Sequence, residues 1–323
     1  MPKSIVYISR KIQEEGLEEL RKHCVVKMHN KITPPTRREF LANVKKADAI
    51  VVSLAEKVNA EVFKANPNLK IVANYAVGFD NIDISAAKKY NIPASNTPGD
   101  YSGVVAEHAM ALIMNLAKRV LEGDKFVRAG KYKFWDPLLL LGNDLKGKTL
   151  GIIGTGRIGS ALVQIAAQGF GMDIIYYDVV RNEQIEKERK AKFMPLPEVL
   201  SKADFVSLHV PLLPATKHLL SDKQFKLMKK TAYLINTARG PVIDEKALVR
   251  VLRSKTIAGA GLDVFEFEPK LVAGLSKLNN VILTPHIASA TFAARAQMAK
   301  IASDNILDVL VRGVKPRNEI IIK

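Results

Sequence analysis

Three candidate side chains for proton transfer and anion binding lie in the second half of the chain, each after a strand-like run. Arg239 follows "AYLINTA", Glu268 follows "AGAGLDVF", and His286 follows "NVILTP". An arginine offers a planar fork of donors to a carboxylate, and a histidine, with an ordinary pKa of about 6.5, can donate a proton near neutral pH. A glutamate beside the histidine would favour the imidazolium and fix the ring. If the strands are parallel, their carboxyl ends meet at one edge, and the pattern predicts an acid–base site there.

A glycine-rich turn separates a strand-like from a helix-like stretch in the middle of the chain. The segment "TLGIIGTGRIGSALVQIA" places Gly154, Gly156 and Gly159 in the G-x-G-x-x-G spacing. In such a unit the first glycine makes the turn, the second admits a pyrophosphate, and the third lets helix and strand pack closely. The positive end of the helix then holds the pyrophosphate. The segment therefore predicts a dinucleotide cofactor.

Asp178 ends the next strand-like run, "MDIIYYD". A carboxylate at this position accepts hydrogen bonds from the adenosine ribose and repels a 2′-phosphate, so it favours NAD over NADP. Arg181 is close in sequence and is a group that would tolerate the phosphate. With hydride from a nicotinamide, a proton from His286 and Arg239 on the substrate oxygens, the residues fit reduction of a 2-oxoacid.

The order of elements predicts two α/β domains that position these residues. In residues 1–100, apolar runs alternate with helix-like patterns, which indicates βαβ units and a parallel sheet. A second alternating set begins at Thr149, after one long helix expected over residues 101–128. The predicted fold is α/β, with two doubly wound parallel-sheet domains. A Rossmann NAD-binding domain, residues 101–287 with the long helix, is inserted in a flavodoxin-like substrate domain, residues 1–100 and 288–323.

Composition excludes several other classes of protein. With 323 residues and 48% hydrophobic content, the chain is long enough for two packed cores. The net charge is +17, but the basic residues are scattered and not interleaved with aromatics, which argues against nucleic acid as a partner. The most apolar window, residues 104–116, is too short to span a membrane. The single cysteine, Cys24, allows no internal disulfide, no metal-ligand spacing is present, and we expect a cytoplasmic protein.

His209 is the main alternative to His286, because it also ends a strand-like run, "DFVSLH". It lies nearer the half of the sheet expected to hold adenosine, and we interpret it as structural. The remaining histidines that we considered lie on helix-like or peripheral segments and are assigned no role: His23, His29, His108 and His218.

Several motifs together resemble those of the D-isomer-specific 2-hydroxyacid dehydrogenases. They are "GTGRIG", "LHVPL", "NTARGPVIDEKAL", "AGAGLDVFEFEP" and "LTPHIASAT", and the resemblance continues through "VANYAVGFDNID" and "NTPGDYSGVVAEHA" in the first domain. It implies Arg239, Glu268 and His286 as the catalytic set, with His286 as the acid/base. It also implies that the backbone amides of Val77 and Gly78 hold the substrate carboxylate.

The same resemblance implies a set of residues around NAD. Asp263 would contact the nicotinamide carboxamide. The other residues of the NAD site would be Gly154, Gly156, Arg157, Ile158, Gly159, Asp178, Val210, Pro211, Thr237 and Ala238.

Within the family, the chain looks most like the glyoxylate/hydroxypyruvate reductases. Leu54 stands where these enzymes place an apolar substrate-pocket residue, and "FWDPLLLLGNDLKGKT" resembles the segment that delivers a tryptophan, here Trp135, from a partner subunit. Trp135 and Leu138 to Leu141 form an apolar group in a connecting loop, which a homodimer would cover. A tryptophan packed inside its own subunit is the alternative.

Three other functions remain open at this level. The 3-phosphoglycerate dehydrogenases often carry an arginine near the position of Leu54, and this chain has Ser53, Leu54 and Ala55, with Lys57 close by. Corepressors of the C-terminal-binding type share the fold and the three catalytic residues but act as NAD-sensing binding proteins. Formate dehydrogenases resemble the chain less, because they lack a glutamate at the position of Glu268. The leading expectation is NADH-dependent reduction of a small 2-oxoacid to the D-2-hydroxyacid.

Overall fold

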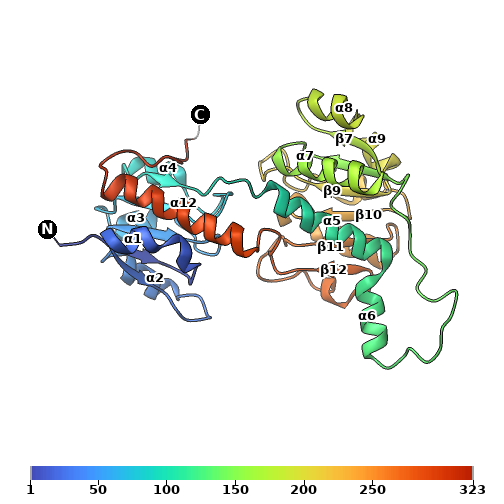
Figure 1. Ribbon diagram of the computed structural model, residues 1–323, viewed down its shortest axis with the longest axis horizontal. Coiled ribbons are helices and arrows are strands. Elements are labelled where there is room, and N and C mark those ends of the chain that lie inside the picture. Colours follow the sequence, from blue (N-terminus) through green and yellow to red (C-terminus); the bar gives the residue numbers. More distant parts are fainter. Residues whose placement is uncertain (1, 322–323) are drawn as a thin grey trace. The chain divides into compact units, whose positions relative to one another are not determined.

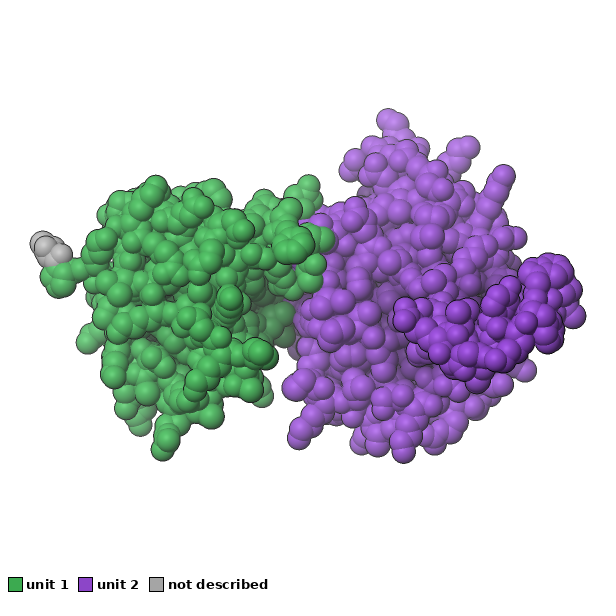
Figure 2. Space-filling view, turned by 60° about the horizontal axis from the view of Figure 1, so that its bottom comes forward, with its two compact units in different colours: residues 1–100, 290–323 green, residues 101–289 purple. Residues whose placement is uncertain are grey.

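The computed structural model describes residues 2–321 and divides into two compact units. Unit 1 contains residues 1–100 and 290–323, and unit 2 contains residues 101–289 (Figure 2). The chain thus crosses between the units at 100/101 and 289/290, against predicted crossings at 100/101 and 287/288.

Unit 1 is built on a five-stranded parallel sheet in the order β2-β1-β3-β4-β5. This is the flavodoxin-like order, in which the chain starts near the middle and reverses direction once. Strands β3 and β4 are buried throughout, which explains their continuous apolar sequences, "AIVV" and "IVAN". The elements are β1 (Ile5–Ile8), α1 (Glu18–His23), β2 (Val25–Met28), α2 (Arg37–Val44), β3 (Ala49–Val52), α3 (Ala60–Ala65), β4 (Ile71–Asn74), α4 (Ile84–Lys89) and β5 (Ala94–Ser95).

The last helix of the chain, α12 (Phe292–Leu310), belongs to unit 1 and packs on α1 and β4. Gly16 permits the close approach, because a Cβ there would lie 2.3 Å from the Cβ of Ala299. The Ser303 hydroxyl donates to the carbonyl of Gly16 at 2.7 Å. Beyond the helix, the amide of Ile320 donates to Ala94 at 2.8 Å, which ties the apolar end to β5. Residues 322 and 323 of that end lie outside the described residues.

Unit 2 holds a seven-stranded parallel sheet in the order β12-β11-β10-β9-β6-β7-β8. Counted from its own first strand, this contains the Rossmann order 3-2-1-4-5-6, and the strand order reverses between β6 and β9. The strands are β6 (Thr149–Ile153), β7 (Asp173–Tyr177), β8 (Lys192–Phe193), β9 (Phe205–Leu208), β10 (Tyr233–Asn236), β11 (Gly259–Leu262) and β12 (Val281–Leu283). The helices between them are α7 (Arg157–Gln164), α8 (Glu183–Arg189), α9 (Leu196–Lys202), α10 (Asp222–Phe225) and α11 (Glu245–Arg253). The predicted fold class is confirmed.

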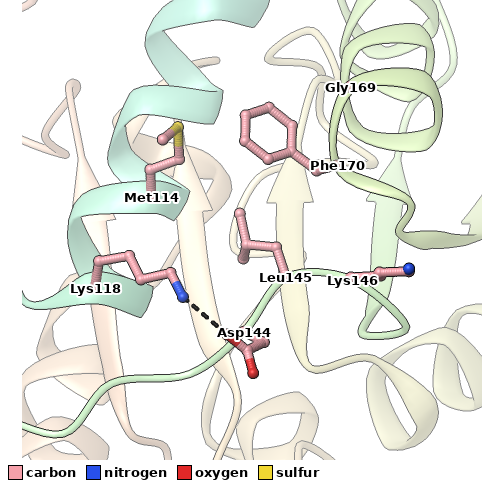
Figure 3. A pocket seen from close by; sticks show the side chains of 7 residues that line it. All are labelled: Met114, Lys118, Asp144, Leu145, Lys146, Gly169 and Phe170. Atoms are coloured by element: carbon pink, nitrogen blue, oxygen red, sulfur yellow. Dashed lines mark hydrogen bonds and ion pairs between the residues drawn. The ribbon is translucent and has the colours of Figure 1, made fainter.

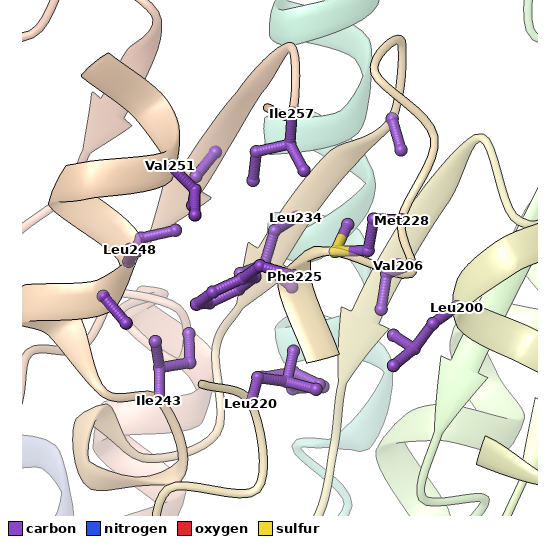
Figure 4. Packing of buried hydrophobic residues seen from close by; sticks show 14 of the residues in the cluster. Leu200, Val206, Leu220, Phe225, Met228, Leu234, Ile243, Leu248, Val251 and Ile257 are labelled. Carbon is purple, nitrogen blue, oxygen red and sulfur yellow. The ribbon is translucent and has the colours of Figure 1, made fainter. Parts of the chain in front are cut away.

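One of the cores of unit 2 lies between the sheet and α9, α10 and α11 (Figure 4). Phe225, Leu234 and Leu248 meet in it, and each is fully buried. Helix α11 presents one apolar face to this core, and its start is fixed by Asp244, whose side chain accepts the amide of Ala247 at 3.0 Å. Burial of one such apolar side chain contributes about 1.5–3 kcal/mol to the free energy of unfolding. The packed core therefore stabilises the strands whose ends carry the site.

The prediction of a single helix over residues 101–128 is wrong. The segment forms α5 (Ser102–Lys118) and α6 (Val120–Arg128), separated by Arg119 in the left-handed region with φ 55°. The Arg119 side chain stabilises the break, because it donates to Glu122 at 2.7 and 2.8 Å and to the Leu141 carbonyl at 3.3 Å. Helix α5 is buried along most of its length, whereas α6 has no buried residue. Among the described residues, no helix is long and apolar enough to cross a membrane.

Candidate active site

The glycine turn after β6 has the backbone geometry that its sequence predicts. Gly154 has φ +95°, and a Cβ there would lie 2.8 Å from the backbone of His209 at the end of β9. Gly159 lies under the turn, where a Cβ would come within 2.1 Å of the Gly154 carbonyl oxygen. Both positions therefore need glycine, the first for its conformation and the second for close packing of α7 on β6.

Gly156, the residue before α7, faces open space. A Cβ at Gly156 would meet nothing within 4 Å, and Arg157 and Ile158 follow it as the first residues of the helix. The first amides of an α-helix have no partner within the helix, and the dipole of the eight-residue α7 favours an anion at this end. The turn thus has the room and the donors that a pyrophosphate requires.

Asp178 follows β7 and reaches back to the glycine turn. Its Oδ2 accepts the Thr155 amide at 2.7 Å and the Thr155 hydroxyl at 3.0 Å, and its Oδ1 accepts the Val179 amide at 2.7 Å. The carboxylate is therefore held beside the turn on the side where the adenosine ribose is expected. Arg181 is engaged elsewhere, because its guanidinium donates to Glu186 at 2.6 and 3.1 Å and lies over the ring of Phe193.

The other residues predicted for the cofactor follow β9 and β10. Strand β9 is the neighbour of β6 in the sheet, and β10 is the neighbour of β9. Val210 and Pro211 follow β9, and Thr237 and Ala238 follow β10. The Thr237 hydroxyl is buried and has no hydrogen-bond partner among residues 2–321, so it has a free donor and acceptor. The carboxyl ends of β6, β7, β9 and β10 thus place all of these residues along one edge of the sheet.

His286 and Glu268 form a hydrogen-bonded pair at the same edge. The distance from His286 Nδ1 to Glu268 Oε2 is 2.9 Å, and Oε1 of the same carboxylate accepts the Phe265 amide, also at 2.9 Å. The glutamate is fixed by its own turn, and it in turn fixes the imidazole ring. About a third of each side chain is exposed, so the pair is open to a ligand. This leaves Nε2 of His286 as the nitrogen that can exchange a proton with a substrate.

The backbone at His286 is held in the left-handed region, φ 54°, by the buried carboxylate of Asp263. Asp263 accepts the amides of Ile287 and Ala288 at 2.9 and 2.8 Å and the Thr284 hydroxyl at 2.6 Å. Its side chain has no exposed surface. These hydrogen bonds give Asp263 a positioning role for the segment that carries His286, and its contact with the nicotinamide carboxamide stays a prediction.

His108 completes the group around Asp263, although no sequence pattern assigns it a role. It lies on α5, and its Nε2 is 3.1 Å from the Thr284 hydroxyl and 3.5 Å from Asp263 Oδ1. Burial alone would raise the pKa of Asp263. Hydrogen bonds from the His108 and Thr284 side chains and from two amides outweigh that effect and hold the pKa below its usual value.

Arg239 follows β10, whose neighbour β11 leads into the turn of Glu268. Gly240 brings the two turns together, since a Cβ there would lie 1.9 Å from the carbonyl carbon of Phe265 and 2.4 Å from the amide nitrogen of Glu266. The Arg239 guanidinium donates to the Ala238 carbonyl at 2.8 Å. The strand ends of β10, β11 and β12 therefore carry Arg239, Glu268 and His286 in adjacent positions of the sheet.

His209 has the properties of a structural histidine. Desolvation lowers its pKa to about 4, so the ring is neutral at physiological pH, and Nε2 lies 2.9 Å from the Ser207 hydroxyl. Its backbone packs against Gly154 of the turn. These contacts are in accord with the interpretation from sequence.

The residues predicted to bind substrate in the first domain lie in unit 1. Leu54 follows β3, and Val77 and Gly78 follow β4. Asn81 joins the two loops, because its amide group donates to the carbonyls of Ser53 and Glu56 at 3.0 and 3.2 Å. Among the hydrogen bonds of residues 2–321, none uses the amide N–H of Val77 or Gly78, which leaves both donors available to an anion.

One hollow of unit 2 lies away from these groups (Figure 3). It measures about 550 Å³ and is lined by residues such as Met114, Leu145 and Phe170, with an ion pair between Lys118 and Asp144 at 3.0 Å. Leu145 precedes β6 and Phe170 precedes β7, so the hollow lies at the amino ends of the strands. It is therefore at the opposite edge of the sheet from the glycine turn. The described residues contain no cluster of side chains suited to hold a metal ion.

Comparison with known proteins identifies the family. The model of the D-isomer specific 2-hydroxyacid dehydrogenase NAD-binding domain matches residues 110–288. A glyoxylate reductase of Korarchaeum cryptofilum is 46% identical over 97% of this chain and 94% of its own length. This chain belongs to the D-isomer specific 2-hydroxyacid dehydrogenase family, and it is an oxidoreductase with a nicotinamide-cofactor domain.

Solved structures agree with this assignment. A protein from Thermus thermophilus superposes with a TM-score of 0.92 at 38% identity, covering 98% of this chain and all of that one. An NADPH-dependent glyoxylate/hydroxypyruvate reductase from Sinorhizobium meliloti, in complex with NADP and malonate, has a TM-score of 0.84 at 29% identity, covering 98% and 97% of the two chains.

Proposed function

We propose that the protein reduces a small 2-oxoacid with NADH, glyoxylate to glycolate or hydroxypyruvate to the D-2-hydroxyacid glycerate, and that His286 is the proton donor. The observation that carries this is the hydrogen bond between His286 Nδ1 and Glu268, which leaves Nε2 for the substrate. The similarity to enzymes named as glyoxylate reductases supports the substrate class.

The residues divide the reaction between them. A bound reduced nicotinamide supplies the hydride that adds to the carbonyl carbon of the substrate. His286 gives the proton from Nε2 to the carbonyl oxygen, while Glu268 stabilises the imidazolium before the transfer and holds the ring in place afterwards. Arg239 holds the carboxylate and carbonyl oxygens. In unit 1, the free amides of Val77 and Gly78 are donors suited to a substrate carboxylate. After release of the product, His286 regains a proton from solvent.

The proposal is tested by following reduced nicotinamide consumption with four oxoacids: glyoxylate, hydroxypyruvate, pyruvate and 3-phosphohydroxypyruvate. Highest kcat/KM for the first two is the expected result. A clear preference for the phosphorylated oxoacid would instead assign the protein to phosphoglycerate oxidation. Absence of turnover with all four, together with tight NADH binding, would favour an NAD-sensing binding protein.

The preference for NADH over NADPH is proposed from the charge on Asp178, which lies beside the turn and has no cation within ion-pair distance among the described residues. Replacing it with asparagine keeps the shape and removes the repulsion of a 2′-phosphate. We expect Asp178→Asn to lower the ratio of the NADPH to the NADH Kd by about tenfold, or roughly 1.4 kcal/mol. Fluorescence titration of both cofactors measures the ratio.

Arg181→Gln is the matched control, because Arg181 is already paired with Glu186. It should leave the ratio unchanged. A wild-type protein that binds NADPH more tightly, like the NADPH-dependent relative, would contradict the role of Asp178.

The partner that we propose is a second copy of the chain, bound through an apolar arm. The arm, residues 120–141, consists of α6 and the loop that follows, and it stands off from the sheet of unit 2 (Figure 1). Trp135 is 75% exposed. Exposed with it are Val120, Leu121, Val127, Tyr132, Phe134, Leu138 and Leu141. An exposed apolar surface of this extent on one short segment is typical of a protein–protein interface, and a two-fold dimer would bury both arms at once. In the dimer, Trp135 of one copy would approach the substrate site of the other.

We expect the double variant Trp135→Ser/Leu138→Ser to be a monomer of 35.6 kDa, whereas the wild type has about twice that mass. Light scattering after gel filtration measures both. Ile32→Ser, at a fully exposed apolar residue in unit 1, is the control and should remain dimeric. A wild-type monomer, or a dimer that survives the double substitution, would contradict the proposal.

A further inference from the structure

A second acid lies behind the His286–Glu268 pair, and the reaction described above does not use it. Glu245 is the first residue of α11 and is 1% exposed. Its Oε1 accepts the amide of Glu266 at 2.8 Å, and its own amide donates to Oε2 of Glu266 at 3.2 Å. Its other oxygen, Oε2, is buried without a hydrogen-bond partner among the described residues. A fully buried carboxyl with one unsatisfied oxygen is costly and calls for an explanation.

The contacts of Glu245 and Glu268 meet at one residue, Phe265, through the two peptide units on either side of it. The amide of Phe265 donates to Glu268 and the next amide, of Glu266, donates to Glu245, so consecutive amides of the turn each bind one carboxyl group. Gly240 packs against the second of these peptides, between Phe265 and Glu266, because no Cβ would fit there. The peptide that holds the Glu268 carboxylate is thus joined directly to the one that Glu245 anchors to a helix of the core.

Burial and the nearby negative charges favour the neutral form of the Glu245 carboxyl. Burial raises its pKa to about 7, and the negative charges of Glu266 and Glu268, both on the turn after β11, act in the same direction, whereas the backbone amides of Glu266 and Val272 oppose the shift. His218, from the segment between β9 and α10, pairs with Oε1 of Glu266 at 2.7 Å, whereas Oε2 of the same carboxylate accepts the amide of Glu245. As a neutral acid, Glu245 can anchor the turn without adding a third negative charge beside the catalytic pair.

We propose that Glu245 is a positioning residue for the Glu268–His286 pair and acts through the two consecutive peptide units that flank Phe265. The expected effect on kcat rests on the proposed function, whereas the ionisation of the Glu245 carboxyl can be tested without turnover.

The kinetic test compares Glu245→Leu, which removes the acceptor, with Glu245→Gln, which keeps it. We expect Glu245→Leu to lower kcat for glyoxylate reduction at least about tenfold with a change of less than about twofold in the NADH Kd, since the glycine turn is untouched. Glu245→Gln should restore most of kcat. Lys246→Leu, at the next and exposed position of α11, controls for changed charge at the helix start. A Glu245→Leu variant that is less heat-stable but has unchanged kcat below its Tm would overturn the positioning role.

The second test is the pH dependence of Tm and does not depend on activity. Because the folded-state pKa of Glu245 is raised from 4.5 to about 7, the folded protein binds this proton more tightly, and wild-type stability falls as pH rises between these values. Glu245→Gln cannot titrate, so its Tm relative to wild type should rise across that window. A constant Tm difference from pH 4 to 8 would overturn the neutral-acid part of the proposal, and this result can be read even if none of the oxoacids is a substrate.

Discussion

His286→Ala should reduce kcat/KM for glyoxylate by about 10²–10⁴-fold while leaving NADH affinity nearly unchanged, because the substitution removes the proton donor without touching the glycine turn. The imidazole lies at the edge of unit 2, about a third exposed, and within the described part of the chain its one hydrogen bond to a side chain is with Glu268. Its loss should therefore cost little stability. Steady-state rates and NADH titration measured on the same preparation separate the two effects.

His23→Ala is the matched control for this prediction. His23 also pairs with a glutamate, at 3.1 Å from Glu19, and is partly exposed. It is the last residue of α1 in unit 1 and has no part in the proposed proton transfer, so its removal should leave kcat/KM within a few fold. Turnover retained by His286→Ala, or lost equally in His23→Ala, would contradict the assignment of the proton donor.

Gly240→Ala is the second change from which we expect a large effect. The new methyl group would lie 1.9 Å from the carbonyl carbon of Phe265 and 2.0 Å from its oxygen, which is backbone that cannot turn aside. The turn of Arg239 and the turn of Glu268 must then move apart. Overpacking of this kind costs about 1–3 kcal/mol, and a displacement of about 1 Å at reacting groups can cost 10²-fold in rate. Tm and kcat should therefore both fall.

A control for the added methyl group is Gly169→Ala, because a Cβ at this exposed glycine would meet nothing within 4 Å. Its Tm and kcat should match those of the wild type. Wild-type activity in Gly240→Ala would mean that the two turns do not need their close contact, and that the catalytic residues are held in some other way.

Local pattern predicted the fold and the strand ends well. The apolar runs are long enough to identify β6, β7, β9, β10 and β11, and a glycine motif at the end of β6 fixes which edge of the sheet is functional. Strand β8 has two residues, Lys192 and Phe193, and is too short to give a periodic signal. The break at Arg119 depends in part on a hydrogen bond to Leu141, which no local pattern reveals.

The supporting residues of the site were not predictable for the same reason. His108 and Thr284 are 176 positions apart, and Glu245 meets Glu266 only because the turn after β11 and the start of α11 lie side by side in the fold. On sequence, His108 belongs to an apolar helix and Glu245 follows an N-capping aspartate, where acids are common. For Asp263, family resemblance implies a contact with the cofactor, and the structure adds its hydrogen bonds to the segment around His286, which no local pattern reveals.

The most direct test of the central claim is to reduce hydroxypyruvate with NADH deuterated at C4 of the nicotinamide and to analyse the product by mass spectrometry and chiral chromatography. Hydride transfer to the 2-oxo carbon, with the proton from His286, predicts D-glycerate that carries deuterium at C2 in the wild type and almost no product in His286→Ala. Tight cofactor binding without transfer of deuterium to the oxoacid, or deuterated L-glycerate, would contradict the account.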